Sequence, residues 1–407
     1  MKKLLLIIIG LFGILVGCQN DEGGNNGLKP RKDINLSVSE SRVVEGNTNF
    51  AFHLFSEMNK MKSEQENWMI SPFSLSMVLG MTSNGASGNT LAEIKKVLGH
   101  ENVSMEETNA FYNKLIKELG DLDDTSQLNI ANSVWAQNGI GLSDSFVEMN
   151  QKNYNAQVQN LDFASPNALT TINQWCAEQT NQTIPAIVDE ISEDTKLILL
   201  NALYFKGVWK NKFEERYTIT DDFTNVDGSI SKVSMMTQSK DLPYAQNEYF
   251  SMGRFDYGNG AFGMTILLPN EGFTLDESLA HLNLTNWDKW NNSWTEARLD
   301  VKFPKFEMKA HDELDDVLKA MGIKEAFSSD ADFSALSDTP LKVGLFEQAS
   351  FVKVDENGTV MGTVSKGNGV FLAPEPVSFY MNRPFVFIIS EQSTGSILLM
   401  GKINAFR

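Results

Sequence analysis

The chain has 407 residues, 42% of them apolar, and its 52 acidic and 34 basic residues give a formal net charge of −18. The basic residues do not cluster, so the charge argues against a nucleic-acid or heparin-like partner. The length and apolar content fit one large domain or two fused lobes rather than several modules.

Nothing in the sequence indicates catalysis. There is no GxSxG elbow and no Walker loop. The four histidines lie outside metal-ligand spacing: His53, His100, His281 and His311. We therefore expect neither an enzyme, nor a metal site, nor a cofactor.

The N-terminus has the pattern of an export signal. Met1-Lys-Lys3 precedes the apolar run from Leu4 to Val16, which spans only about 20 Å as a helix, against roughly 30 Å for the hydrocarbon core of a bilayer. The sequence Leu15-Val16-Gly17-Cys18 resembles the lipobox of bacterial lipoproteins. That resemblance implies that Cys18 becomes a lipidated N-terminus.

These features divide the chain into three parts. We expect a signal peptide at 1–17, a lipid-anchored flexible linker at 18–37 and a folded body at 38–407. The linker assignment depends on 19–27, which has three glycines and no apolar residue. The expected location is a bacterial (outer) membrane, with the body periplasmic or at the cell surface. Cys176 then has no disulfide partner and is expected to pack as a small apolar residue.

Apolar periodicity gives the body its secondary structure. Ser71 is placed to cap a helix that has Pro72 at its first position. The continuous apolar run 197–205 predicts a strand that is buried on both faces. Further predicted helices are 49–58, 75–81, 90–98, 170–180 and 314–321, and further strands are 67–70, 128–136, 262–268, 299–306, 345–354, 384–389 and 396–400. Helices come first and strands follow, which indicates an α+β fold.

The stretch from Val354 to Pro374 reads as a strand that has been left out of a sheet. Its valines favour extended backbone, and no proline interrupts residues 355–373. Its four glycines keep it easy to bend. A long loop that could equally be a strand is the feature of the sequence that most needs explanation.

Several segments together resemble the serpin family. Asn67–Ser74 with Gly85-Ala86 and Thr90 is similar to the family segment N-x-x-x-S-P-x-S…G-A…T. Asn201–Trp209 is similar to N-A-x-x-F-K-G-x-W. The remaining matches occur in the family's order at 301–306, 321–327, 331–334, 382–387 and 401–402.

The resemblance implies a fold and a mechanism. The fold has three β-sheets, surrounding helices and an exposed reactive-centre loop, here at about 358–376. The mechanism is suicide inhibition: a target protease attacks the loop and forms an acyl-enzyme, and the cut loop inserts as a strand into the main sheet. The implied partner is a target protease in a covalent complex with a monomeric inhibitor.

The family's hinge falls on the start of this loop. Glu356 and Gly358-Thr359 fit the pattern, whereas Val360-Met361 replaces the usual acidic and first small residue. The hinge continues through Gly362 and Thr363. Met361 is bulky for an inward position, although it is adaptable.

Residues 359–372 would span about 45 Å as a strand at roughly 3.3 Å per residue. Side chains alternate between the two faces. By family geometry, one set faces the core (Thr359, Met361, Thr363, Ser365, Gly367, Gly369), and the other faces solvent (Val360, Gly362, Val364, Lys366, Asn368). A slip of one residue would bury the Lys366 charge.

The reactive bond has several candidates. Counting forward from Glu356 by the family's usual loop length places Leu372 just before the cut and Ala373 after it. Counting back from Phe379 places Val370 or Phe371 just before the cut instead. These apolar residues fit a chymotrypsin-like or elastase-like serine protease, and some cysteine proteases. Lys366 would be a second, trypsin-like site.

Two regions of the family's main sheet, called the shutter and the breach, correspond to five residues of this chain. Ser71, Ser74 and Asn201 are expected under the opening sheet together with Gln348, which stands where many relatives carry a histidine. We expect the Gln348 amide to bond to Asn201 and to Ser71 or Ser74, and Trp209 to pack near the top of the sheet. The alternative function is a non-inhibitory serpin that acts as a cell-surface binding protein, which Val360-Met361 supports.

Overall fold

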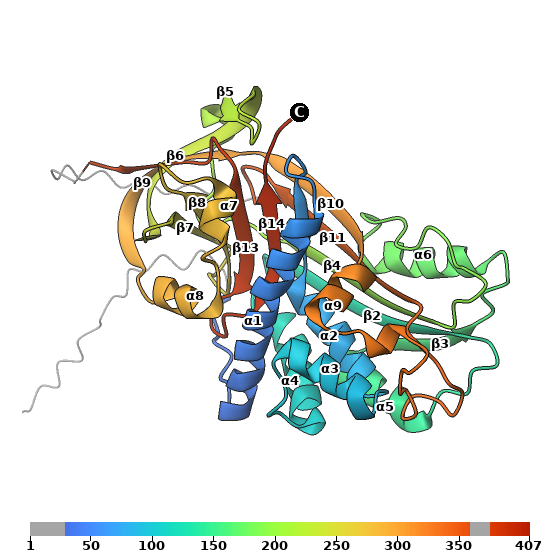
Figure 1. The fold of residues 1–407 in the computed structure, drawn as a ribbon. Coiled ribbons are helices and arrows are strands. Elements are labelled where there is room, and N and C mark those ends of the chain that lie inside the picture. The colour runs from blue at the N-terminus through green and yellow to red at the C-terminus, as the bar shows by residue number, and fades with distance from the viewer. Residues whose placement is uncertain (1–28, 359–374) are drawn as a thin grey trace, which may run out of the picture.

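The computed structural model describes residues 29–358 and 375–407, and contains two hydrogen-bonded sheets in that part of the chain. The five-stranded sheet has the order β10 (Phe306–Glu313), β11 (Leu345–Val354), β4 (Leu197–Lys206), β2 (Gln127–Gln137), β3 (Gln157–Leu161). It runs diagonally through the molecule in Figure 1.

The nine-stranded sheet joins strands that lie far apart in the sequence, among them the C-terminal ones. Its order is β1 (Trp68–Ile70), β14 (Ile397–Ile403), β13 (Phe385–Glu391), β8 (Phe262–Pro269), β7 (Phe250–Asp256), β6 (Ile230–Gln246), β9 (Thr295–Pro304), β12 (Val377–Tyr380), with β5 (Ile219–Thr224) paired to β6. One end of β6 pairs with β5 and the other with β7. Two of the three expected sheets are therefore continuous through this long strand.

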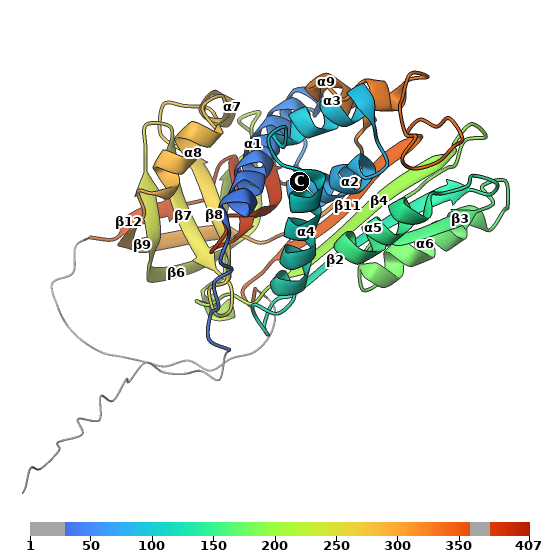
Figure 2. The same cartoon turned by 90° about the horizontal axis from the view of Figure 1, so that it is seen from below.

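Helices cover both faces of the five-stranded sheet (Figures 1 and 2). The helices of the described residues are α1 (Val38–Met61), α2 (Pro72–Ser83), α3 (Gly88–Leu98), α4 (Met105–Leu119), α5 (Asp144–Tyr154), α6 (Ala168–Gln179), α7 (Leu275–Leu279), α8 (Leu284–Asn291) and α9 (Asp315–Met321), with 3₁₀ turns η1 (Glu215–Tyr217) and η2 (Glu325–Phe327). Of these, α7, α8 and η1 pack against the nine-stranded sheet instead. α6 closes a separate core on one face with Ile172, Trp175 and Cys176. The main core occupies the other face.

Local sequence explains the two elements that matter most for the site. The Ser71 hydroxyl accepts the backbone N–H of Ser74, and Pro72 opens α2, as the sequence predicts. Every residue of α2 is buried, so the helix lies inside the body. In β4 the residues from Leu197 to Phe205 are buried on both faces, which confirms the prediction from the continuous apolar run.

Two differences from the sequence predictions bear on the site. The predicted strand 299–306 is two strands, because β9 ends at Pro304 and β10 begins at Phe306 in the other sheet. Apolar residues continue through this change of sheet, which hid it. Residues 29–37, assigned to the linker, contact the body, since Ile34 is 3% exposed and belongs to the main core.

Candidate functional site

The centre of the five-stranded sheet is a pair of parallel strands, β11 and β4. Their register runs from Leu345↔Ile198 to Phe351↔Tyr204, and we call this ladder the seam. β11 pairs antiparallel with β10 on its other side, and β4 pairs antiparallel with β2. The seam is thus the one parallel contact between long strands at the middle of the sheet, and no strand lies between β11 and β4.

Below the seam, β11 is tied to the start of α2. The Ser71 N–H donates to Gln348 Oε1 (2.6 Å), and Gln348 Nε2 donates to the Ser71 carbonyl (2.9 Å). The Ser71 hydroxyl donates to the Leu398 carbonyl of β14 (2.6 Å). This confirms the predicted contact between Gln348 and Ser71, and it joins helix, seam and second sheet at one point.

The predicted bond from Gln348 to Asn201 is wrong. The two residues are register partners across the seam, but the Asn201 amide donates instead to Asn132 Oδ1 (2.8 Å) on β2. Asn132 donates in turn to the Tyr154 carbonyl (3.0 Å). The Asn201 amide is therefore directed toward β2 and not across the seam to β11.

Three buried polar atoms near the seam have no hydrogen-bond partner among residues 29–358 and 375–407. They are Ser74 Oγ, Asn201 Oδ1 and Ser350 Oγ, and their residues are at most 1% exposed. Alternation places Gln348 and Ser350 on the same face of β11 as Phe346 and Val352, which belong to the main core. A buried polar atom without a partner lowers the stability of the folded state by about 1–3 kcal/mol, so these three oxygens destabilise the seam.

At its far end, β11 enters a tight turn, Asp355–Gly358, which we call the hinge turn. The Gly358 N–H donates to the Asp355 carbonyl (3.2 Å), so Glu356 and Asn357 are the two central residues. Gly358 has φ +65°, and a Cβ there would clash with the Trp209 backbone nitrogen. Glycine is required at this position because both the left-handed conformation and the close approach exclude a side chain.

Glu356 fixes the hinge turn electrostatically. It is 5% exposed, and its carboxylate accepts from Lys305 Nζ (2.7 Å) and Thr218 Oγ1 (2.7 Å). Burial alone would raise the pKa of this carboxyl, but the bonds from Lys305 and Thr218 outweigh burial and lower the pKa. The carboxylate is therefore ionised at neutral pH and holds the turn against the start of β10.

Trp209 holds the other side of the hinge turn. Its indole N–H donates to the Asp355 carbonyl (2.8 Å), and its backbone N–H donates to the Asn357 carbonyl (3.2 Å). The ring is 2% exposed and stacks on Tyr257 at 4.4 Å with an interplanar angle of 13°. The predicted packing role of Trp209 is confirmed, and its two hydrogen bonds also hold the hinge turn directly.

Part of the predicted site lies outside the described residues. This applies to the lipidation candidate Cys18, to the hinge residues Thr359, Val360, Met361, Gly362 and Thr363, and to the reactive-bond candidates Lys366, Val370, Phe371, Leu372 and Ala373. Of the predicted site, the structure brings Ser71, Ser74, Asn201 and Gln348 together at the seam. Glu356, Gly358 and Trp209 meet at the hinge turn.

Sequence reasoning missed five residues that complete these clusters: Lys305, Thr218, Asn132, Ser350 and Tyr257. Lys305 lies inside a quoted motif, 301–306, so a search for a basic partner of Glu356 had a place to begin. The other four carry no local signal, because their roles arise from contacts made across the sheets.

Among the described residues, no group of histidine, cysteine, aspartate or glutamate side chains is arranged to hold a metal ion. In 29–358 and 375–407, no helix is both long and apolar enough to cross a membrane. Cys176 is buried, and burial raises the pKa of its thiol to about 12. Its predicted role as an apolar helix residue is confirmed.

Comparison with known proteins matches this architecture to one family. The model of the serpins (serine protease inhibitors) matches residues 45–405. Neuroserpin of Gallus gallus is 32% identical over 91% of this chain and 95% of that protein. The chain belongs to the serpin family.

Solved structures agree with this assignment. Native tengpin, a thermophilic serpin, has a TM-score of 0.84 and 27% identity, with 93% of this chain and 97% of that chain covered. Thyroxine-binding globulin in complex with thyroxine has a TM-score of 0.81 and 27% identity, with 90% and 98% covered. The α+β serpin fold expected from the sequence is therefore confirmed.

Proposed function

We propose that the protein is a suicide inhibitor of serine endopeptidases, and that it acts by inserting its own cleaved loop into the seam. The observation that carries this proposal is the parallel pairing of β11 and β4 next to a two-residue turn. A strand that follows β11 through such a turn runs antiparallel to β11, and therefore also antiparallel to β4. Insertion replaces one parallel ladder with two antiparallel ones, which are slightly more stable per residue.

The hinge turn also sets the register of insertion. With Glu356 and Asn357 at the centre of the turn, Ser350 comes opposite Thr363, and Gln348 comes opposite Ser365. Two hydroxyls then arrive on the face that holds the unpartnered oxygens of Ser74, Asn201 and Ser350. This pairing lowers the free energy of the inserted state by removing part of the cost described above.

The chemical step traps the protease before hydrolysis. The protease serine Oγ attacks the carbonyl of the residue before the reactive bond, the C–N bond breaks, and the new amine leaves with a proton. The loop is then joined to the protease by an ester. Insertion carries the esterified protease to the opposite end of the sheet, where distortion of its active site prevents water from releasing it.

The loop sequence suggests the class of target. Leu372 before the bond, or Val370 or Phe371 one or two residues earlier, fits the apolar pocket of chymotrypsin-like or elastase-like serine proteases, and of some cysteine proteases. Lys366 offers a trypsin-like site, but cleavage there shortens the inserted strand by six residues. We therefore place the main cut at 370–373.

The test is to mix the protein with chymotrypsin-type, elastase-type and trypsin-type proteases. We expect a covalent complex that survives SDS with the first two, and mass spectrometry of the released C-terminal peptide to place the cut at 370–373. A cleaved loop together with full protease activity in every mixture would contradict inhibition.

A non-inhibitory role as a surface binding protein is the second candidate. Val360-Met361 departs from the inhibitory hinge pattern, and the fold matches thyroxine-binding globulin in complex with thyroxine. This alternative predicts cleavage without trapping. The SDS experiment therefore separates the two functions directly.

We further propose that the protein is a lipoprotein, exported and anchored to a bacterial membrane through Cys18. The support is the apolar run that ends in Leu15-Val16-Gly17-Cys18. In fractionated cells we expect the wild-type protein in the membrane fraction and the Cys18→Ser variant outside it. Equal partition of the two proteins would contradict anchoring at this residue.

A further inference from the structure

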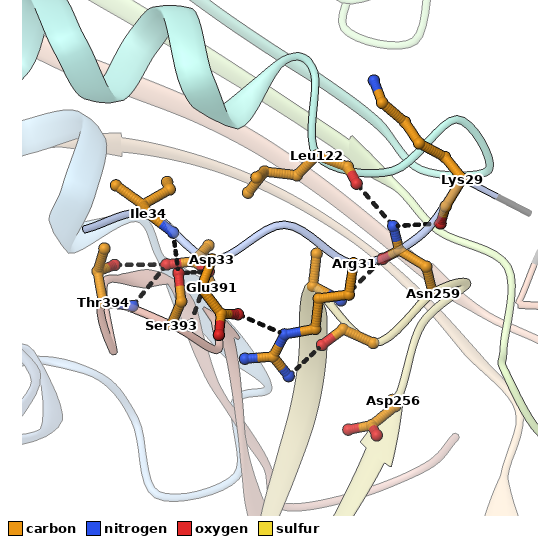
Figure 3. A network of polar contacts seen from close by, with 12 residues as sticks. Lys29, Arg31, Asp33, Ile34, Leu122, Asp256, Asn259, Glu391, Ser393 and Thr394 are labelled. Carbon is orange, nitrogen blue, oxygen red and sulfur yellow. Dashed lines mark hydrogen bonds and ion pairs between the residues drawn. The ribbon is translucent and has the colours of Figure 1, made fainter.

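Residues 29–37 are the last part of the expected linker 18–37 and lie against the body (Figure 3). We call the part of the linker before them, 18–28, the tether. The Lys29 carbonyl accepts from Asn259 Nδ2 (3.1 Å), and Arg31 Nη1 donates to the Gly260 carbonyl (3.0 Å). The Ile34 N–H donates to Ser393 Oγ (2.9 Å). We call residues 29–37 the strap.

A buried isoleucine and hydrogen bonds to the body hold the strap in place. Lys29 lies 3.5 Å from Asp121 and 3.8 Å from Asp124, but both carboxylates are well exposed, so these ion pairs contribute little. Ile34, by contrast, is inserted in the main core. The strap is therefore fixed mainly by the burial of Ile34 and by hydrogen bonds to the body.

Asn259 connects the strap to two other segments. Besides Lys29, its amide donates to the Leu122 carbonyl (2.7 Å) after α4. Its side-chain oxygen accepts the Ala261 N–H (2.9 Å) and so shapes its own loop between β7 and β8. The strap, the end of α4 and this loop thus meet at one side chain (Figure 3).

The same loop supports the hinge turn from behind. Tyr257 forms a β-bridge with Trp209 and stacks on its ring. The Gly258 N–H donates to the Val208 carbonyl (2.7 Å), and Trp209 donates to Asp355 as described above. A continuous series of contacts therefore runs from the strap through Asn259, Tyr257 and Trp209 to the end of β11.

We propose that the strap is a restraint on sheet opening: docked, it holds Tyr257 and Trp209 against the hinge turn and slows insertion of an uncleaved loop. This inference rests on the proposed insertion mechanism. Because the strap continues directly into the expected tether, force on the tether or proteolysis within 29–36 would release the restraint. The inhibitor would then lose activity without ever meeting a protease.

The test compares two isoleucine truncations in the full-length chain. Ile34→Ala loosens the strap, whereas Ile94→Ala removes an equally buried isoleucine from α3 (Ile34 3% and Ile94 0% exposed), away from the series of contacts. Both are expected to lower the midpoint of unfolding. Only Ile34→Ala, and Asn259→Ala with it, is expected to speed conversion of the uncleaved protein to an inactive, heat-resistant form, by about fivefold or more.

The readout separates regulation from plain destabilisation, because a merely weakened protein loses activity without gaining heat resistance. Conversion of all three variants at the wild-type rate, or an equal acceleration in Ile94→Ala, would overturn the role of the strap. If wild-type protein cut in its loop also gained no heat resistance, the insertion mechanism itself would have failed. The two failures are thus distinguishable.

Discussion

Cleavage of the loop is expected to raise the midpoint of thermal unfolding by on the order of 20 °C. The physical reason is the second antiparallel ladder formed at the seam between β11 and β4. A net hydrogen bond contributes about 1 kcal/mol, so a strand of roughly ten residues that bonds on both sides contributes on the order of 10 kcal/mol. On the proposed mechanism the intact protein is stable for kinetic reasons, because opening the seam breaks bonds before new ones form.

This prediction is checked by circular dichroism of intact and cut protein during heating. The control is protein cut only within 19–27, which leaves the loop intact and should unfold with the uncut chain. If the loop-cut protein unfolds at the temperature of the intact one, or at a similar urea concentration, no strand has been gained and the proposed mechanism is wrong.

A charge on the inward face of the inserting strand is expected to turn the inhibitor into a substrate. Thr363→Asp places a carboxylate opposite Ser350, on the side of the main core, whereas Val360→Asp places the same carboxylate opposite the exposed Lys353. Burying an unpaired charge costs several kcal/mol. A barrier raised by about 3 kcal/mol slows insertion roughly 100-fold, which gives water time to release the protease.

The measurement is the number of inhibitor molecules consumed for each protease molecule trapped, together with the yield of SDS-stable complex. Thr363→Asp should be cut quickly and trap almost nothing, and Val360→Asp should behave as wild type. If both variants failed to trap the protease, the register set by the hinge turn would be contradicted. If both trapped it as well as the wild type does, insertion would be contradicted.

Elements that depend on one stretch of chain were predictable from the sequence. The apolar run in β4 and the Ser71–Pro72 start of α2 are local signals, and both are confirmed. The exchange of sheets between Pro304 and Phe306 was missed because both sheets bury one face of the strand. A periodic pattern reports burial but does not identify the neighbour that provides it.

The candidate site was predictable in membership and less so in its contacts. Gln348, Ser71 and Asn201 were placed together, yet Asn201 pairs with Asn132, since a side-chain amide has several partners within reach and only the packed geometry selects one. The strap was missed for a related reason. Its polar composition is that of a linker, and the groups that fix it, Asn259 and Ser393, lie far along the chain.

The conformation of Gly358 makes the root of the loop a fixed pivot. It is packed against the backbone of Trp209, with φ +65°, so under the proposed mechanism the loop would insert from a point that stays in place. The final position of a captured protease would then depend on the number of residues between Gly358 and the cut. Capture at Lys366 instead of Leu372 would leave the protease about 20 Å short, at roughly 3.3 Å for each of the residues lost.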